Sequence, residues 1–544
     1  AQGSSTGMIP LIDLGSGTYQ GFDGGLYGGG ENAPPADHLQ AALDHAVQIV
    51  PRNAAGEPDP AGGVIVMLSI GMSNTTHEFS VFERQEDLNT GRNARVVILN
   101  TALGGQAAED IAPPGAPYWN IVLERLAAMH LTPAQVQVAW LKEAMRQPPD
   151  DFPGHAGELR DHLISIAQNL RGLFENMHLC YLSSRIYAGY AQTTLNPEPQ
   201  AYESGFSVRW TIEEQMNGDP LLNHDPQAGP VEAPLLLWGP YLWADGVIPR
   251  SDGLTWLEED FQSDGTHPSA SGEQKVGDLL SAFFATDATA QVWYAPDPGV
   301  SLVALDATDD ASVSAAEPAA NFGAAGELIA EGGPLPLHTY LRFDAPALTE
   351  PRLWSKLGLR VLSSGGGPLA LVPESGWSEE SITYGNAPPF ETPALVNIPR
   401  ASRDGTIAAG VSGILEEDTD GVLSFALPGA PGPVRRYASK EGGQPPRLVV
   451  ALLTGSPPED DFLRGDGNED GAADLADAVF ALAHLFQAAP APCLDALDAN
   501  DDGVLDIGDP IALLGFLFAA GAPPPPPFPD PGPDPTPDPL GCGG

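Results

Sequence analysis

The chain has 544 residues, which is too long for one hydrophobic core, so two to four domains are expected. Its 72 acidic and 24 basic residues give a formal net charge of −48, which makes nucleic acid and anionic membrane surfaces poor partners. No apolar run approaches the roughly 18 residues that a membrane-spanning helix needs, so no membrane span is expected.

The first residues and the three cysteines indicate an oxidising compartment. The chain begins Ala1-Gln2 rather than with methionine, as a protein does after removal of a signal peptide, so a secreted, extracellular or cell-surface protein is expected. Cys180 lies in an apolar segment, whereas Cys493 and Cys542 bracket the C-terminal region. A Cys493–Cys542 disulfide with Cys180 buried and free fits such a compartment, although three pairings are open.

Two shifts in composition divide the chain into three modules. A helix-and-strand pattern gives way to short strands at a linker over residues 295–300, and a second linker over 454–460 precedes acidic repeats. The predicted domains are an α/β domain over 1–294, an all-β jelly-roll sandwich over 301–453, a small α domain over 461–522, and a proline-rich tail over 523–544 that is extended or disordered.

The first module alternates apolar runs with helical periodicity. The runs predicted as buried parallel strands are residues 62–70, 95–101, 136–142 and 178–184. The segments predicted as amphipathic helices are 118–129, 159–175 and 272–284. This alternation predicts a doubly wound α/β domain, whose ligands bind beyond the carboxyl ends of the strands.

A serine follows the first of these strands. Gly71-Met72-Ser73-Asn74-Thr75 comes directly after the strand, and a helix-like segment follows it. A serine there lies at the carboxyl edge of the sheet and at a helix N-terminus, where backbone N–H groups can stabilise an oxyanion. A serine that opens a helix is also a common N-cap, so Ser73 alone leaves both interpretations open.

A second motif lies near the end of the module. Asp264-Gly265-Thr266-His267 precedes the last predicted helix, and a histidine three residues after an aspartate in a tight turn can act as a general base that the aspartate orients. Together these residues resemble the SGNH (GDSL-like) hydrolase family over about 64–284. Ser73 matches the nucleophile of that family's first block, and Asp264 and His267 match the Asp-x-x-His of its last block.

The resemblance extends to the oxyanion site. Gly104 follows the second strand and matches the family's oxyanion-hole glycine, with Gly105 beside it. The family's Gly-x-Asn-Asp block is missing after the third strand, where Lys142 stands as a candidate polar group at the site. Loss of one oxyanion donor typically costs on the order of a hundred- to a thousandfold in rate. The resemblance implies a flavodoxin-like three-layer domain and a serine esterase.

Residues 183–252 are dense in aromatic, charged and turn residues, including Arg185, Tyr202, Trp238 and Trp243. Long loops at a sheet edge can form a sugar-binding cleft in which aromatic rings stack on pyranose rings. The alternative is that the tryptophans only hold an irregular loop in place.

The second module carries aromatic-rich strand motifs, among them residues 339–344, 376–384 and 437–441. In this order, after an Asn321-Phe322-Gly323 turn, they resemble the DNRLRE family of extracellular β-sandwich modules, some of which are related to carbohydrate-binding modules. The resemblance implies polysaccharide binding or adhesion, and a passive spacer is the alternative.

The third module contains two copies of a calcium-loop pattern. Acidic or amide side chains stand at loop positions one, three, five, nine and twelve, and glycine at position six supplies the turn. The second copy begins 32 residues after the first, and the backbone carbonyl at position seven completes each set. The predicted ligands of two calcium ions are Asp466, Asn468, Asp470, Ala472, Asp474 and Asp477, then Asp498, Asn500, Asp502, Val504, Asp506 and Asp509.

Each acidic loop leads into a helix with matched apolar residues, so the two helices are expected to pack together. This duplicated loop-helix module resembles dockerins over about 461–518. The resemblance implies docking to a protein partner, and a calcium-stabilised domain for anchoring or self-assembly is the alternative.

The sequence therefore predicts a secreted serine esterase that removes acyl groups, preferably acetyl groups, from polysaccharide. In this hypothesis Ser73 is the nucleophile, His267 the base and Asp264 the residue that orients it. The alternative is a non-catalytic extracellular scaffold that assembles into a fibre, layer or surface complex.

Overall fold

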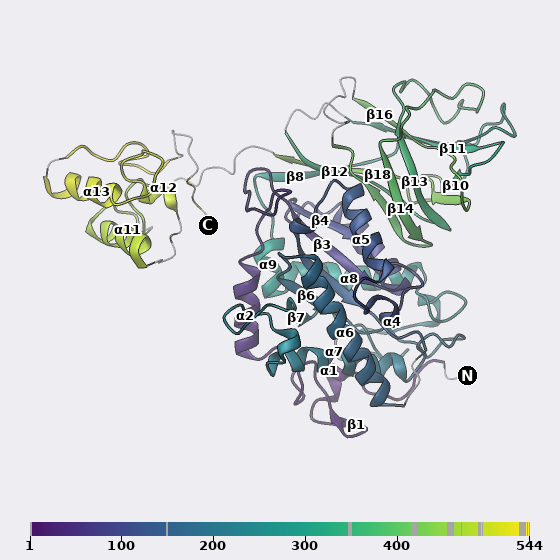
Figure 1. Cartoon of the computed structure of the whole chain (residues 1–544), viewed down its shortest axis with the longest axis horizontal. Coiled ribbons are helices and arrows are strands. Elements are labelled where there is room, and N and C mark those ends of the chain that lie inside the picture. Colours follow the sequence, from purple (N-terminus) through teal and green to yellow (C-terminus); the bar gives the residue numbers. More distant parts are fainter. Residues whose placement is uncertain are drawn as a thin grey trace. The chain divides into compact units, whose positions relative to one another are not determined.

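The computed structural model describes residues 3–147, 151–345, 351–412, 414, 421–453, 462–468, 470–487, 491, 493–519, 521–532, 540 and 542. Its elements are labelled in Figure 1. The chain divides into two compact units, one of Ala1–Pro296 with Ser301–Leu452 and one of Asp297–Val300 with Leu453–Gly544. Among the described residues, no helix has both the length and the apolar character that crossing a membrane requires.

A five-stranded parallel sheet forms the centre of the α/β domain. Its strands are β3 (Ile65–Gly71), β4 (Val96–Asn100), β5 (Val136–Lys142), β6 (Leu179–Leu182) and β7 (Leu235–Trp238). The order β4-β3-β5-β6-β7 is the flavodoxin-like order 2-1-3-4-5 when these strands are numbered along the chain. Every strand residue is buried, as expected for a parallel sheet covered on both faces, which explains the continuous apolar runs in the sequence.

Helices surround this sheet. They are α1 (Leu11–Leu14), α2 (Ala36–Ala46), α3 (Ser73–Glu86), α4 (Ala108–Ile111), α5 (Pro117–Ala128), α6 (Gly154–Leu173), α7 (Gln200–Met216), α8 (Ala270–Thr286) and α9 (Ala288–Tyr294). A small hairpin pairs β1 (Thr18–Tyr19) with β2 (Phe22–Asp23). Helix α3 packs on α8, and α6 packs on α7. The four predicted strands and three predicted helices are confirmed, whereas α2, α7 and the short strand β7 were not predicted.

The second domain is an antiparallel β-sandwich. Its strands are β8 (Val300–Asp306), β9 (Asp309–Ser314), β10 (Glu327–Ala330), β11 (Leu337–Asp344), β12 (Arg352–Arg360), β13 (Ser364–Leu371), β14 (Val396–Ser402), β15 (Thr406–Ala409), β16 (Val422–Leu427), β17 (Arg435–Ala438) and β18 (Arg447–Leu453). One sheet has the order β14-β13-β16-β11-β9, the other has the order β15-β12-β18-β8, and β10 pairs with β17.

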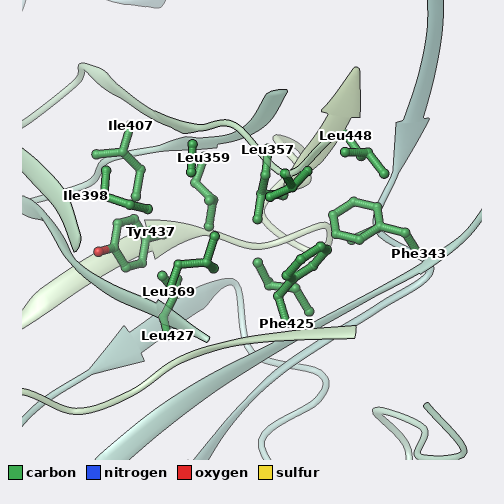
Figure 2. Close-up of a cluster of buried hydrophobic side chains, with 14 of the residues drawn as sticks. Phe343, Leu357, Leu359, Leu369, Ile398, Ile407, Phe425, Leu427, Tyr437 and Leu448 are labelled. Atoms are coloured by element: carbon green, nitrogen blue, oxygen red, sulfur yellow. The ribbon is translucent and has the colours of Figure 1, made fainter. Parts of the chain in front are cut away.

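Side chains from both sheets fill the core of the sandwich. Phe343 and Phe425 come from the five-stranded sheet, and Leu357, Leu359 and Leu448 come from the four-stranded sheet (Figure 2). All five are fully buried. Burial of apolar side chains between two antiparallel sheets stabilises a sandwich, which is the fold that the short strands in the sequence predict.

The sandwich contacts the α/β domain through charged side chains that are themselves buried. The ammonium group of Lys356, on β12, lies 2.7 Å from Asp87 and 3.3 Å from Glu83, and the Trp354 indole N–H donates to the Ala94 carbonyl at 2.9 Å. Arg360, at the end of the same strand, lies 2.7 Å from Glu273 on α8. Because a buried charge without its partner is costly, these pairs hold the two domains in one compact unit.

The C-terminal unit contains the helices α11 (Leu475–Gln487), α12 (Leu494–Leu497) and α13 (Gly508–Ala519). Helix α11 packs on α13, as the repeat predicts, with small residues such as Ala478 and Ala499 around Leu513 at the contact. Some of the matched apolar residues expected in this contact instead lie on the surface. The exposed ones are Val479, Phe486, Ile511 and Phe518.

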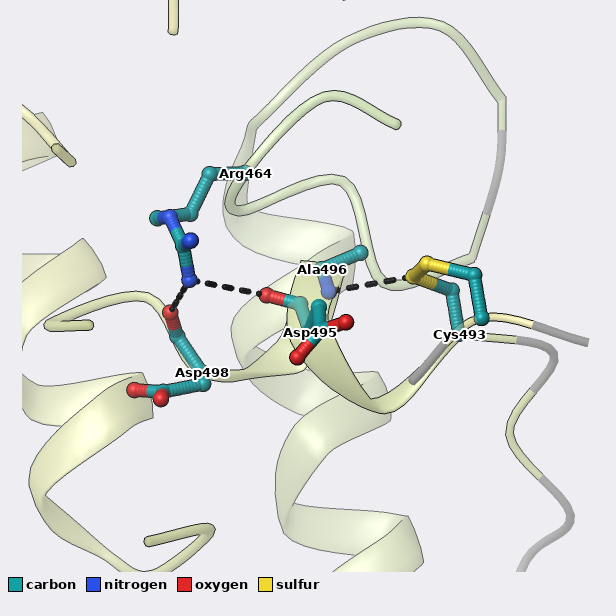
Figure 3. Close-up of a disulfide and its surroundings, with 6 residues drawn as sticks. Arg464, Cys493, Asp495, Ala496 and Asp498 are labelled. Atoms are coloured by element: carbon teal, nitrogen blue, oxygen red, sulfur yellow. Dashed lines mark hydrogen bonds between the residues drawn. A yellow bond between two sulfur atoms is a disulfide. The ribbon is translucent and has the colours of Figure 1, made fainter. Parts of the chain in front are cut away.

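The disulfide between Cys493 and Cys542 is present (Figure 3). Cys180 is buried and free. The buried Arg464 lies nearby and donates to the backbone carbonyls of Asp495 and Asp498 at 3.2 and 2.9 Å. The linker over 454–460 and residues 533–539 of the tail lie outside the described residues.

The described part of the proline-rich tail packs on the C-terminal unit. The rings of Phe528 and Phe516 lie 5.4 Å apart, and Arg464 donates from its backbone to Pro527 and from its side chain to Pro526. The tail was expected to be extended or disordered, and over residues 523–532 the described chain has no helix and is held against the C-terminal unit by these contacts.

Candidate active site

Ser73 is the first residue of α3, directly beyond the carboxyl end of β3. Gly71 makes this turn possible. It has φ +153°, and a Cβ at this position would overlap the carbonyl oxygen of Lys142 on the neighbouring strand β5. The chain can therefore pass close to β5 and place the serine hydroxyl at the sheet edge only because residue 71 has no side chain.

The structure brings Ser73, His267 and Asp264 together as a continuous hydrogen-bonded chain. Ser73 Oγ lies 2.9 Å from His267 Nε2, and His267 Nδ1 lies 2.6 Å from Asp264 Oδ2. With Nδ1 donating to the carboxylate, Nε2 is left to accept the serine proton. This arrangement is the geometry of a serine nucleophile with an oriented general base.

Several donors hold Asp264 in its ionised form. Its Oδ1 accepts the backbone N–H groups of Thr266 and His267 at 2.9 and 3.0 Å. Burial opposes ionisation, but the His267 ring and these backbone N–H groups outweigh it and lower the pKa of Asp264. The carboxylate therefore remains charged and can stabilise an imidazolium at position 267.

Gly104 lies beside Ser73 and contacts the sandwich. Its backbone N–H donates to Ser402 Oγ at 3.1 Å, and Ser402 ends strand β14. A Cβ added to Gly104 would lie 2.9 Å from Ser402 Oγ and 3.6 Å from Ser73 Cβ. The Gly104 N–H group, expected as an oxyanion donor, is thus adjacent to Ser73 and donates a hydrogen bond to the hydroxyl of Ser402 in the second domain.

Lys142 is not at the pocket. Its ammonium group donates to both carboxylate oxygens of Glu78, and both side chains are completely buried. The expectation that Lys142 supplies a polar group to the site is therefore corrected, because the neighbouring helix α3 provides a buried counterion that the sequence could not reveal. Burial lowers the pKa of Lys142 and raises that of Glu78.

A cavity of about 270 Å³ opens at the serine and histidine. Gly105 lines the cavity, as the sequence predicts for a substrate site, whereas Gly104 and Asp264 are not among the lining residues. The lining residues are Met72, Ser73, Asn74, Gly105, Gln106, Ala107, Ala144, Met145, Arg146, Arg185, Leu195, Asn196, Thr266 and His267. Sequence reasoning missed Arg146 and Asn196 here, because the turns after β5 and β6 have no motif that signals a pocket.

Of the two interpretations of residues 183–252, the buried aromatic rings support the one in which the tryptophans hold an irregular segment in place. Trp238, Trp243, Tyr241 and Tyr202 are all at most 4% exposed. The indole N–H of Trp238 donates to Leu26, and that of Trp243 donates to Glu198. These rings fill the core around α7, so they cannot stack on a sugar. Arg185, from the same segment, does line the cavity.

His77, which had no predicted role, lies next to His267. Its ring centroid is 5.5 Å from that of His267, and its nitrogens lie 3.8 Å from Glu273 and 4.0 Å from Asp404. Burial, together with the nearby His267 and Arg360, lowers the pKa of His77 to about 3. His77 is therefore neutral at ordinary pH.

The two acidic loops of the C-terminal unit are closed by their own carboxylates. Asp466 accepts the backbone N–H groups of Asp470 and Gly471, and Asp477 accepts that of Asp474. In the second loop Asp498 accepts from Gly503 and Asp509 accepts from Asp506. Gly471 and Gly503, at position six of each loop, have φ +90° and +73°.

Two side-chain oxygens of the second loop are buried without a hydrogen-bond donor in the part of the chain that the structure describes. They are Asn500 Oδ1 and Asp509 Oδ1, at positions three and twelve. Oxygen donors of this kind are the ligands that calcium prefers. The backbone carbonyls at position seven belong to Ala472 and Val504, whose N–H groups donate to Asp470 and Asp502.

Comparison with protein-family models found a match in the sandwich. Residues 301–452 match the family model of carbohydrate-binding module family 96. The match supports the carbohydrate-binding part of the expectation for this module, and the resemblance to DNRLRE modules stays a prediction. A search of curated proteins found no match to the chain.

Solved structures of hydrolases show weak similarity. A proposed acylhydrolase from Bacteroides fragilis shares 11% identity, with 46% of this chain and 97% of that chain covered and a TM-score of 0.24. An extracellular lipase from Streptomyces rimosus shares 10% identity over 40% and 100% of the two chains, with a TM-score of 0.22. A carbohydrate acetylesterase from Xanthomonas citri shares 9% identity over 70% and 80%, with a TM-score of 0.21.

Similarity at this level does not establish a shared activity. The assignment of chemistry to the α/β domain therefore depends on the hydrogen-bonded chain of Ser73, His267 and Asp264 and on the cavity in front of it.

Proposed function

We propose that the chain is a serine esterase of the SGNH type that removes acyl groups, chiefly acetyl groups, from extracellular polysaccharide. The observation that carries this proposal is the Ser73–His267–Asp264 chain, with distances of 2.9 and 2.6 Å, which opens into a cavity. An open site favours the esterase over a non-catalytic scaffold, in which nothing would select for a polarised serine beside a cavity.

The reaction follows from this geometry. Ser73 Oγ forms a bond to the ester carbonyl carbon while its proton passes to His267 Nε2. The tetrahedral intermediate then breaks its bond to the sugar oxygen, which takes the proton from His267 and leaves as a hydroxyl group. Water repeats the two steps on the acyl-enzyme and releases the carboxylic acid.

Backbone donors stabilise the oxyanion of both intermediates. The N–H groups of Ser73 and Gly104 lie at the position expected for the oxyanion hole. In this structure the Gly104 N–H group donates to Ser402 Oγ, so in the proposed mechanism it exchanges that acceptor for the oxyanion; the Ser402 hydroxyl proton, which this bond does not use, would be a further donor. A serine of the sandwich domain would then replace a donor that the third-strand segment lacks.

The other domains supply attachment. The match of the sandwich to a carbohydrate-binding family supports a glycan as the surface on which the esterase acts. Two calcium ions in the acidic loops would stabilise a dockerin-like C-terminal module. The exposed Val479 and Phe486, with Ile511 and Phe518 at the equivalent positions of the repeat, are suited to contact a protein partner or a second copy of this module.

The test is hydrolysis of 4-nitrophenyl acetate and of an O-acetylated polysaccharide by the full chain in calcium, compared with the Ser73→Ala variant. We expect activity that disappears in Ser73→Ala. It should persist in the control variant Ser165→Ala, because the Ser165 hydroxyl lies on the exposed face of α6. Activity that survives in Ser73→Ala, or a wild-type chain inactive on several acyl esters, would favour the scaffold instead.

A further inference from the structure

Arg185 is a buried cation without a counterion. It follows the carboxyl end of β6, and only 2% of it is exposed. Among the described residues, its Nε and Nη2 atoms have no hydrogen-bond partner, and the hydrogen bond found for Nη1 is to the sulfur of Met72, at 3.9 Å. A guanidinium group removed from water without a partner is costly, so a structure that retains one gains from it elsewhere.

Four carboxylates act on Arg185 through space, those of Glu78, Glu198, Glu143 and Asp264. Glu78 accepts from Lys142, Asp264 accepts from His267, and Glu198 accepts the indole N–H of Trp243. Glu143 accepts the backbone N–H of Ala144, and burial raises its pKa well above the ordinary value, which favours its neutral form. These groups act on Arg185 only through space, because none of them forms an ion pair with it among the described residues. The positive charge is therefore available to a ligand.

Arg185 also faces the reacting groups. It lines the same cavity as Ser73 and His267, and its contact with Met72 places it beside the residue that precedes the serine. An anion that reaches this guanidinium is therefore part of the molecule whose ester lies at Ser73. Arginine binds a carboxylate through two parallel N–H donors, and Arg185 has two nitrogen atoms without partners.

Two further groups in the cavity lack partners. The side-chain oxygens of Asn74 and Asn196 are buried and accept no hydrogen bond, and both residues line the cavity. An amide oxygen accepts from a hydroxyl group. One unpartnered cation and two unpartnered acceptors are together complementary to a ligand that carries one carboxylate and several hydroxyl groups.

We propose that Arg185 binds a carboxylate of the substrate and that the site is specific for O-acylated uronic acid residues. This inference rests on the proposed esterase function and names its substrate class. The long-range field of the chain, with a net charge of −48, repels polyanions, so a fixed cation at the serine is needed to hold such a substrate. The amide oxygens of Asn74 and Asn196 can accept hydrogen bonds from sugar hydroxyl groups, so we assign the carboxylate to the sugar and not to the acyl group.

The first experiment compares substrates and variants. The substrates are O-acetylated oligogalacturonate, O-acetylated xylo-oligosaccharide and 4-nitrophenyl acetate, and the variants are Arg185→Met, Arg185→Lys and Arg160→Met. Arg160, on α6, is paired with Asp161 and Glu214 and is not among the residues that line the cavity, so its variant controls for loss of charge. We expect Arg185→Met to reduce kcat/KM on the uronate substrate about 10- to 100-fold, because a hydrogen bond to a charged group is lost.

The neutral substrates test the alternatives. Arg185→Met is expected to leave kcat/KM on xylo-oligosaccharide and aryl acetate within about twofold of wild type, and Arg185→Lys to keep part of the uronate activity. An equal loss on all three substrates would overturn the proposal, because Arg185 would then stabilise the transition state of any ester. A preference for the 4-nitrophenyl hemiester of succinic acid over 4-nitrophenyl butyrate, without a uronate preference, would place the carboxylate on the acyl group and overturn the assignment to the sugar.

Binding provides a readout that does not need turnover. In the Ser73→Ala background, calorimetric titration with oligogalacturonate should give an affinity that Arg185→Met removes and that Arg160→Met leaves in place. A chain that hydrolyses neutral acetates through Ser73 but binds uronates no better than xylo-oligosaccharides would retain the esterase function and refute the inference. Uronate binding through Arg185 in a chain inactive on every ester would refute the esterase and retain the carboxylate site.

Discussion

The Ser73 site and the acidic loops of the C-terminal unit are built in opposite ways. The hydrogen bond between Ser73 and His267 joins residues 194 positions apart, and Ser402 approaches Gly104 from another domain, 298 positions away. In the acidic loops the bonds that close the turn span three to five residues, as between Asp498 and Gly503. A site of the first kind depends on the packing of two domains, whereas a site of the second kind depends on its own twelve residues.

The largest expected effect is on catalysis by Ser73 and His267, which Asp264 orients. Asp264→Asn should lower kcat by about 10⁴-fold, because the amide no longer orients the His267 ring with Nε2 as the acceptor. The measurement is ester hydrolysis beside Asp161→Asn, a control on the exposed face of α6. A loss below tenfold in Asp264→Asn would mean that the carboxylate has no part in the reaction.

Breaking the contact between domains should remove stability and activity together. Lys356→Ala leaves Glu83 and Asp87 buried without their cation and should cost about 3–5 kcal/mol in the free energy of unfolding. The control Arg436→Ala removes an exposed ion pair with Glu327 and should cost less than about 1 kcal/mol. Denaturant unfolding and ester hydrolysis are measured on both variants. Full activity in a destabilised Lys356→Ala would show that the esterase site does not need the sandwich.

Removing calcium should destabilise the C-terminal unit and leave the esterase activity unchanged. A ligand present at about a hundred times its Kd stabilises a fold by about 2.7 kcal/mol, so chelation should lower the Tm of the C-terminal unit. Calorimetry of the full chain in calcium and in excess chelator measures the change, and Asp509→Asn should reproduce part of it. Unchanged melting in chelator would contradict the calcium sites, and lost esterase activity would contradict their independence from Ser73.

A methyl group at Gly104 tests how tightly the two domains meet at the site. In Gly104→Ala the new Cβ would lie 2.9 Å from Ser402 Oγ. The end of β14 must therefore shift, and the N–H group of residue 104 moves with it. We expect kcat to fall about 10- to 100-fold with a small change in Tm. Gly157→Ala on α6, where a Cβ meets nothing within 4 Å, is the matched control and should behave as wild type. Unchanged turnover in Gly104→Ala would remove this N–H group from the oxyanion hole.

The smallest expected effect is a pH dependence at His77. Its pKa of about 3 in the folded chain lies below the unfolded value of about 6.5, so the unfolded chain takes up the proton first. His77 therefore contributes stability above about pH 6.5 that is lost as the pH falls from 6.5 toward 3. His77→Gln should make Tm depend less on pH across this window. If the slopes of Tm against pH in His77→Gln and wild type coincide, the histidine does not titrate in the unfolding reaction.

Local patterns were enough to predict much of the fold. The apolar runs over 65–71 and 136–142 predicted central strands because a parallel sheet buried on both faces tolerates few polar side chains. The short strand β7 escaped prediction because its four residues are too few for a pattern to stand out from a buried loop. Helix α7 escaped because its polar residues are buried, so it has no clear apolar face.

The sequence by itself determined the candidate serine, histidine and aspartate, the glycine turns of the acidic loops and the boundaries of the modules, because each is a property of a few neighbouring residues. Only the tertiary structure decided that Lys142 faces Glu78, that Ser402 reaches Gly104 and that Arg185 has no counterion beside the serine. Whether a side chain is paired, buried or open to a cavity depends on what other segments bring to it. That information lies in the packing of elements hundreds of residues apart and not in the spacing of a motif.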